Sequence, residues 1–374
     1  MSDHPGADAP SPSASPSLES LGYSDRWRAL FAAHAEAGHV PARVVRSDRG
    51  SVVVAAAHGI VRAEPSARLR RARGGDGPPA CGDWVVLDPA PGHEVALVEA
   101  VLPRSSAVTR GAADESSPPQ VVAANIDTVF IVHTVEPEPN LRRIERELAL
   151  AWESGAVPVV VLTKADLITD AETRAAGVRD VALGVDVVVT SVPTGLGIEA
   201  VRAYAGEGRT VALFGPSGAG KSTLINALLG EERQATREVR LSDGKGRHTT
   251  VARELVPLPG GGALLDTPGL RAVAMVDAQG GIAAAFDDIA DLAQSCRFRD
   301  CGHAGEPGCA VKAAVERGEL PAARLASWHK LQREAHVAAM KTDARLRIEE
   351  VRRWKIIYKS ARDHSKRAGR DGER

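Results

Sequence analysis

A glycine-rich segment between an apolar run and a helix-forming run constrains this chain more than any other feature. Residues 215–222 match the pattern G-x-x-x-x-G-K-[ST] at every specified position. Thr210–Phe214 before them is typical of a buried strand, and Thr223–Leu229 after them favours a helix. Glycines let backbone N–H groups converge on phosphate oxygens, and the helix N-terminus adds a partial positive charge. The segment therefore predicts a site for a nucleoside triphosphate.

Within this loop we expect Lys221 to neutralise the β and γ phosphates and the Ser222 hydroxyl to bind Mg²⁺. The residues expected to contact the nucleotide here are Gly215, Pro216, Ser217, Gly218, Ala219, Gly220, Lys221, Ser222 and Thr223. Further along, Asp266-Thr-Pro-Gly269 follows another apolar run. An aspartate at a strand end suits Mg²⁺, and the Gly269 amide is placed to sense a γ phosphate.

Residues Thr163, Lys164, Ala165 and Asp166 end the apolar run Val157–Leu162 and indicate which base is read. A carboxylate at Asp166 can accept hydrogen bonds from the guanine N1–H and exocyclic amine, a donor pair that adenine lacks. The Lys164 stem can lie along the base. The run Val187–Thr190 then leads into a loop, including Ser191 and Val192, that can offer a backbone N–H to the guanine oxygen. This pattern favours GTP over ATP and argues against the alternative of a metabolic kinase or ATPase.

The order of these motifs is unusual. In ordinary guanine-nucleotide switches the phosphate loop comes first, whereas here the base-reading segments (163–166 and 191–195) precede it and Asp266–Gly269 comes last. This order predicts a circularly permuted GTPase domain. The same sheet can still assemble, because ligand loops gather at the carboxyl ends of parallel strands whatever their chain order.

Three cysteines and a histidine lie within fourteen residues: Cys296, Cys301, His303 and Cys309. Four such ligands match a closed tetrahedral Zn²⁺ site without an open catalytic position. The alternative is a set of buried free thiols, which the histidine makes less attractive. We expect one structural zinc ion, and we expect the isolated Cys81 to be a small core residue.

Length and composition give the surroundings of these motifs. The 374 residues predict two or three domains, and 44% hydrophobic with 25% charged residues is ordinary for a globular protein. No apolar run approaches the roughly 18 residues that span a bilayer, and no secretory signal is recognisable, so we expect a cytoplasmic protein without a membrane partner. We expect a disordered tail over 1–35, a β-rich barrel or sandwich over 36–118, a GTPase domain over 119–275, a zinc-binding helical domain over 276–340 and a basic C-terminal helix or tail over 341–374.

The net charge of −1 hides two basic clusters, one over residues 62–73 and one from Lys341 to the C-terminus. Basic clusters on a neutral chain suggest a specific anionic surface. A solvated helix face is the alternative explanation.

The combination of these motifs resembles the family of ribosome small-subunit-dependent GTPases A (RsgA, also called YjeQ). The resemblance runs from about Val40 to about residue 340. It is carried by the β-rich N-terminal unit, Ala124–Asp127, the permuted motifs, Gly215–Asn226, and the Cys/Cys/His/Cys cluster, together with Lys245–Thr250.

The resemblance implies an N-terminal OB-fold barrel, a circularly permuted P-loop α/β GTPase domain and a C-terminal helical zinc-binding domain. It also implies that the protein binds the 30S subunit and its 16S rRNA late in maturation and hydrolyses GTP to GDP with stimulation by that subunit. We take the protein to be a monomer. By the same resemblance, Thr249 or Thr250 lies in the switch I region and meets Mg²⁺ or the γ phosphate, beside Ser222 and Asp266.

Three positions depart from related patterns. Thr163 stands where many GTPases have Asn, Val251 replaces a third Thr common in the family, and Leu270 stands where Ras-like enzymes keep a water-orienting Gln. Because an apolar residue cannot orient water, slow intrinsic hydrolysis that needs a partner is expected. His248 is the candidate for positioning the water, with a role-free surface histidine as the alternative. A nucleotide-gated RNA-binding protein in which hydrolysis is incidental is the competing function.

Overall fold

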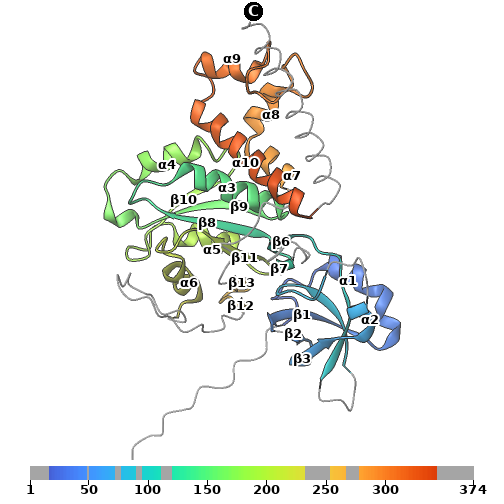
Figure 1. The fold of residues 1–374 in the computed structure, drawn as a ribbon. Helices are drawn as coiled ribbons and strands as arrows, with labels where there is room; N and C mark the ends of the chain where they lie inside the picture. The colour runs from blue at the N-terminus through green and yellow to red at the C-terminus, as the bar shows by residue number, and fades with distance from the viewer. Residues whose placement is uncertain are drawn as a thin grey trace, which may run out of the picture.

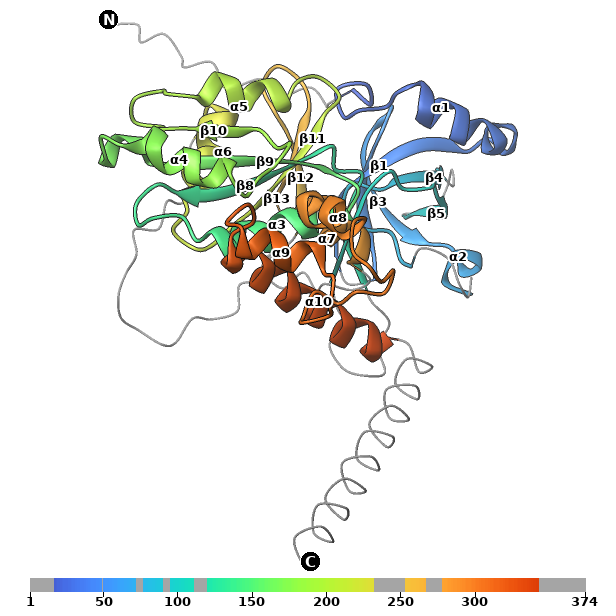
Figure 2. The same cartoon turned by 90° about the horizontal axis from the view of Figure 1, so that it is seen from above.

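The computed structural model describes residues 17–48, 50–71, 77–89, 95–110, 120–231, 253–266 and 278–342. Figures 1 and 2 show an N-terminal barrel, a central layered α/β unit and a C-terminal group of helices. Within these ranges, no helix is long and apolar enough to cross a membrane.

The N-terminal unit is a closed five-stranded barrel. Its strands follow the order β1-β2-β3-β5-β4, and pairing of β1 with β4 closes it; only the β3–β5 pair is parallel. Alternate residues of these strands point inward and form one apolar cluster that includes Val44, Val54 and Leu87. The strands are β1 (Val40–Ser47), β2 (Val52–Ala56), β3 (Gly59–Pro65), β4 (Trp84–Asp88) and β5 (Ala96–Val101).

The segment before the barrel is folded from residue 17 onward, so the prediction of a disordered tail over 1–35 is wrong for residues 17–35. Helix α1 (Asp25–Phe31) buries Trp27 and Phe31, and the preceding turn buries Leu21. The Trp27 and Trp84 rings lie 5.9 Å apart, and both belong to a different apolar cluster from the one inside the barrel, so this segment packs against the outward-facing side of β4. Leu18, Leu21, Trp27 and Phe31 are its buried apolar side chains, although the flanking composition is polar.

Six strands form the central sheet in the order β10-β9-β8-β11-β13-β12, all parallel except β12. The central strands are buried on both faces, as continuous Val/Leu runs require. On one face Ile131 and Val160 pack with helix α3, and on the other Phe130 and Val159 pack with α5 and α6. The strands are β8 (Thr128–Thr134), β9 (Val157–Thr163), β10 (Val187–Val189), β11 (Thr210–Phe214), β12 (Arg253–Pro257) and β13 (Ala263–Asp266). The helices are α3 (Leu141–Glu153), α4 (Ala171–Arg179), α5 (Ile198–Tyr204) and α6 (Lys221–Leu229).

The barrel and the central sheet are joined by hydrogen-bonded strands. β1 pairs antiparallel with the edge strand β12 through Arg46↔Glu254 and Ser47↔Arg253, so the two units form one eleven-stranded sheet. A two-stranded sheet of β6 (Ala107–Arg110) and β7 (Gln120–Ala124) lies beside this junction.

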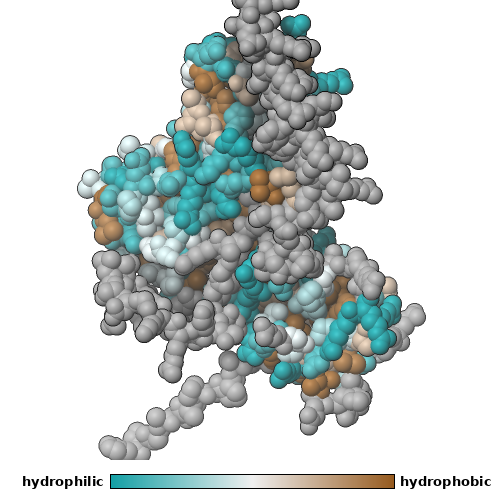
Figure 3. Space-filling model, in the orientation of Figure 1, coloured by the Kyte–Doolittle hydropathy of each residue, from teal (hydrophilic) through white to brown (hydrophobic). Residues whose placement is uncertain are grey.

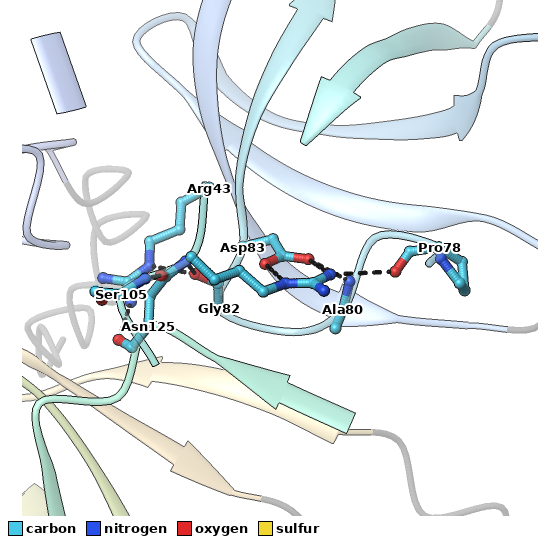
Figure 4. A network of polar contacts seen from close by, with 8 residues as sticks. Arg43, Pro78, Ala80, Gly82, Asp83, Ser105 and Asn125 are labelled. Carbon is cyan, nitrogen blue, oxygen red and sulfur yellow. Dashed lines mark hydrogen bonds and ion pairs between the residues drawn. The ribbon is translucent and has the colours of Figure 1, made fainter. Parts of the chain in front are cut away.

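A buried guanidinium seals the junction. Arg43, 2% exposed, donates to the carbonyl oxygens of Leu21, Gly82 and Asn125 and to Thr210 Oγ1 at 2.8 Å. Figure 4 shows Arg43 and Asn125 converging on Gly82, whose carbonyl oxygen accepts a hydrogen bond of 3.0 Å from Asn125 Nδ2. Because these partners come from distant parts of the sequence, a single side chain links the N-terminal segment, the barrel and β11. Burial lowers the pKa of Arg43 to about 10.

The C-terminal helices pack on α3. The backbones of α7 and α3 are in direct contact, since a Cβ at Gly281 would lie 2.1 Å from the Ala149 carbonyl oxygen. Arg324, on the long helix α10, is 3% exposed and donates to both Asp288 oxygens at 2.6 and 2.9 Å and to Glu145 of α3 at 3.1 Å. The C-terminal helices are α7 (Gln279–Ala285), α8 (Asp287–Ala293), α9 (Ala310–Glu316) and α10 (Ala322–Thr342), and the barrel adds the short helix α2 (Ala67–Arg71).

The three-part architecture predicted from the sequence, with its permuted strand order, is confirmed. The exact domain boundaries inside it stay predictions, and the predicted basic C-terminal helix or tail over 341–374 lies outside the described residues after Thr342.

Candidate nucleotide site and metal centre

The phosphate loop connects β11 to α6 and takes a tightly constrained path. Gly215, Gly218 and Gly220 have φ values of 132°, 80° and 83°, in the left-handed region that favours glycine. A Cβ at Gly215 would lie 2.1 Å from the Val132 carbonyl oxygen, so the loop passes directly against β8. Lys221 begins α6, and its Nζ donates to the carbonyl oxygens of Gly215 at 2.8 Å and Pro216 at 2.5 Å. The Lys221 side chain therefore lies over the phosphate loop and is hydrogen-bonded to its backbone.

The base-reading segments lie beside each other at the same edge of the sheet. β9 ends at Thr163, and Lys164 adopts φ 62°, which turns the chain so that Asp166 lies near the next strand. The Ser191 hydroxyl donates to Asp166 Oδ1 at 2.6 Å, and the Ala165 N–H donates to the Thr190 carbonyl oxygen. One Asp166 oxygen is thus held by the second base-reading loop.

Thr163 connects the base side of the site to the phosphate side. Its buried hydroxyl donates to the Ala219 carbonyl oxygen at 2.7 Å, across a sequence separation of 56 residues. Gly220 packs against it, since a Cβ there would lie 3.1 Å from Thr163 Oγ1. The sequence analysis placed Thr163 in the base-reading segment and noted its departure from Asn, but it did not predict this contact with the phosphate loop. A hydroxyl at the end of a buried strand was the available signal.

Some predicted site residues lie outside the described ranges. Asp266 is the last residue of β13, whereas Gly269, His248, Thr249 and Thr250 fall in the segments 267–277 and 232–252. The structure brings together the phosphate loop and both base-reading loops, along the edge where β8, β9, β10 and β11 end.

Sequence reasoning also missed a buried polar pair behind the phosphate loop. His133, on β8, is 3% exposed, and its Nε2 lies 2.7 Å from Glu147 Oε2 on α3. The other Glu147 oxygen accepts from Arg143 Nε at 2.9 Å. This pair fixes α3 against the strand that supports Gly215. A histidine within an apolar strand was the only sequence signal for it.

The predicted metal ligands converge in the C-terminal unit. One ligand atom from each of Cys296, Cys301, His303 and Cys309 lies within 4.8 Å of the others. His303 Nδ1 is 3.5 Å from Cys309 Sγ and 3.7 Å from Cys296 Sγ, and these two sulfurs are 4.0 Å apart. A tetrahedron with Zn–S near ~2.3 Å and Zn–N near ~2.1 Å has edges of about 3.5–3.8 Å. The cluster therefore fits a zinc ion with four protein ligands.

Left-handed backbone angles and a carboxylate shape the loop around these ligands. His303 has φ 57° and Gly308 has φ 78°. The Glu306 carboxylate accepts from the N–H groups of Gly302, Ala304 and Gly305, and these bonds, chiefly that of Gly305, lower its pKa to about 2. Cys309 Sγ accepts from the Lys312 N–H, so Cys309 caps the N-terminus of α9, which begins at Ala310.

Comparisons with known proteins agree with this geometry. The family model described as "RsgA GTPase" matches residues 101–276. A relative from Streptomyces coelicolor, named "Small ribosomal subunit biogenesis GTPase RsgA", is 47% identical over 94% of this chain and 96% of its own length. A relative of the same name from Opitutus terrae is 45% identical over 94% of this chain and 99% of its own.

Solved structures show the same architecture. The crystal structure of YjeQ from Thermotoga maritima has a TM-score of 0.61 and 28% identity, and covers 79% of this chain and 98% of that chain. The structure of YloQ, described as a circularly permuted GTPase, has a TM-score of 0.58 with 22% identity over 81% of this chain and 96% of that chain, and supports the fold alone.

Proposed function

This chain belongs to the family of RsgA GTPases, and from this membership we propose that it hydrolyses GTP to GDP and phosphate during biogenesis of the small ribosomal subunit. The observation that carries the proposal is that the phosphate loop and the segments proposed to read the base contact each other, although their order along the chain is permuted. Thr163 holds the phosphate loop at Ala219, and Ser191 holds the base-reading carboxylate of Asp166.

The roles proposed for the site follow from its chemistry. Asp166 accepts the two guanine donors, and the αL turn at Lys164 lets its stem lie along the base. Backbone N–H groups of 215–222 bind the phosphates, while Lys221 exchanges its loop carbonyl partners for phosphate oxygens. Mg²⁺ supplies charge neutralisation at the β and γ phosphates when bound. Its proposed protein ligands are Ser222, Asp266, Thr249 and Thr250, and Gly269 is proposed to sense the γ phosphate.

Hydrolysis is proposed to depend on the partner. Leu270 cannot orient a water molecule, so His248 is proposed to position it once the subunit is bound. We expect His248→Ala to lower subunit-stimulated turnover while leaving GTP affinity unchanged. Turnover that stays at the wild-type level would rule out this role.

The proposed partners are the 30S subunit and its 16S rRNA, for a monomeric protein acting in the cytoplasm, where ribosomes assemble. On the barrel, Arg62 lies on β3, and Arg68, Arg70 and Arg71 lie on α2. OB-folds bind nucleic acid through such basic faces. A structural zinc at the Cys/His cluster is proposed to hold the C-terminal unit in shape.

The decisive experiment measures GTP turnover by the purified protein alone and with isolated 30S subunits, with ATP and with 50S subunits as controls. Strong stimulation by 30S alone supports the proposal. Turnover that 30S leaves unchanged contradicts it. A non-hydrolysable GTP analogue should then trap the protein on the subunit, whereas a passive RNA-binding protein would ignore the γ phosphate.

A further inference from the structure

A polar cavity lies behind the phosphate loop. Its volume is about 380 Å³, and it opens between the start of α3 and helix α10. Its lining residues are Asn140, Arg142, Arg143, Arg146, Glu147, Leu150, Phe214, Gly215 and Lys330. It shares only Gly215 with the nucleotide loop, so it is a separate site from the one that Lys221, Ser222 and Asp166 form.

The cavity carries a net positive charge. Four of its lining residues are basic and one is acidic. That acid, Glu147, already accepts from Arg143 and lies against His133. Arg146 is tied through Nε to Glu334 of α10 at 3.1 Å.

Within the described part of the chain, two of the four cations have no counter-ion: neither the Arg142 nor the Lys330 side chain forms an ion pair or a hydrogen bond, and both residues are exposed. The Arg146–Glu334 pair holds their two helices together, so both positive charges already line the same cavity. The N-terminus of α3 adds a partial positive charge, and no acidic residue in its first turn offsets it.

Part of the cavity lining is apolar. Phe214 is 5% exposed and Leu150 is 6% exposed, and both belong to the packed core. A low-dielectric lining strengthens the attraction of an anion to the surrounding cations. Figure 3 shows hydrophilic residues gathered over the region in which α3 and α10 lie, so the surroundings suit a polar partner.

We propose that this cavity binds a phosphate group between Arg142 of α3 and Lys330 of α10. Resting on the proposed function, we assign its source to the RNA backbone of the small subunit. A guanidinium and an ammonium group are the usual protein partners of a backbone phosphate, which contributes to affinity without reading sequence. One phosphate held there would bridge the GTPase unit to the C-terminal helices behind Gly215.

The test uses the full-length protein loaded with a non-hydrolysable GTP analogue, so that the phosphate loop is filled. Arg142→Gln, Lys330→Gln and the double variant are compared with Arg333→Gln, an exposed residue of α10 that does not line the cavity. Binding to isolated 30S subunits is measured across salt concentrations. Inorganic phosphate binding is measured separately by calorimetry at low salt, and thermal melting checks that each variant is folded.

We expect each cavity variant to weaken 30S binding roughly three- to tenfold and to lower the salt slope by about one, with Arg333→Gln close to wild type. The double variant should lose less than the product of the two single effects, because both cations hold one phosphate. If only inorganic phosphate binding is lost, the cavity is a phosphate site whose source is the free anion.

Unchanged binding of both probes, or an equal loss in Arg333→Gln, overturns the proposal. Failure of the proposed function is distinguishable from these outcomes. In that case the wild-type protein itself neither binds 30S nor hydrolyses GTP faster with it, and the calorimetry still decides whether the cavity takes phosphate.

Discussion

Replacing Arg324 by alanine tests how the C-terminal helices are held on the GTPase unit. The guanidinium binds Asp288 through two hydrogen bonds and Glu145 through one, and it lies 4.7 Å from the Phe286 ring centroid. Its removal leaves the Glu145 carboxylate buried without its cation, since that side chain is only 3% exposed. Breaking a buried pair from one side costs about 3–5 kcal/mol.

The variant should also respond to pH in a defined direction. Burial already raises the pKa of Glu145, although Ser327 and Arg324 oppose that shift. Without Arg324 the pKa rises further. An acid whose pKa is raised by folding loses stability as the pH rises from its unfolded value through its folded one. The deficit should therefore be largest near neutral pH and shrink as the pH falls toward about 5.

Thermal unfolding at several pH values measures this effect. We expect the unfolding temperature of Arg324→Ala to fall by roughly 4–8 °C at neutral pH. Adding Glu145→Gln should recover part of the loss, because no charge is then stranded. Arg179→Ala, which breaks an exposed pair with Glu172, is the matched control and should change little. A loss below about 1 kcal/mol, or a deficit independent of pH, would refute this reasoning.

Three further changes test other parts of the molecule. Asp166→Asn should weaken GTP binding about a hundredfold or more. It should improve the relative binding of xanthosine triphosphate, whose C2 carbonyl oxygen can accept a hydrogen bond from the new amide. Equal losses for both nucleotides in a fluorescence titration would count against the base assignment. Cys309→Ser should lower the zinc content in metal analysis and the melting temperature of the C-terminal unit, whereas full zinc retention would contradict the ligand set. Burial raises the pKa of Cys81 to about 12, so folding favours the neutral thiol, and stability should fall as the pH rises above about 9. Cys81→Ala should flatten that fall, and an unchanged pH slope in denaturant melts would argue against it.

Much of the candidate site could be predicted because its motifs are local. Residues 215–222 carry their own loop geometry, since the left-handed φ values at Gly218 and Gly220 require glycine. The four metal ligands lie within fourteen residues, so their spacing alone indicated a tetrahedral site. The central strands were also predictable, because a strand covered on both faces reads as a continuous apolar run.

The barrel was harder to predict. The sequence left a barrel and a sandwich open, and the pairing of β1 with β4 that closes the barrel joins residues about 45 apart. The folded segment before the barrel was missed. Its apolar residues are few, and they are buried only because the outward-facing side of β4, including Trp84, gives them an apolar surface to pack against.

The sequence by itself predicted the glycine-rich loop and its expected nucleotide contacts, the segments expected to read the base, the Cys/His cluster expected to bind zinc, and the permuted order of the strands. Tertiary structure alone decided how these parts are joined: Arg43 to Thr210, Arg324 to Glu145, Thr163 to Ala219, and Arg146 to Glu334. The physical reason is the range of the interactions. Periodicity and spacing record which face of a strand or helix a residue occupies, whereas partners separated by 56 to 188 residues meet only after the whole chain has packed.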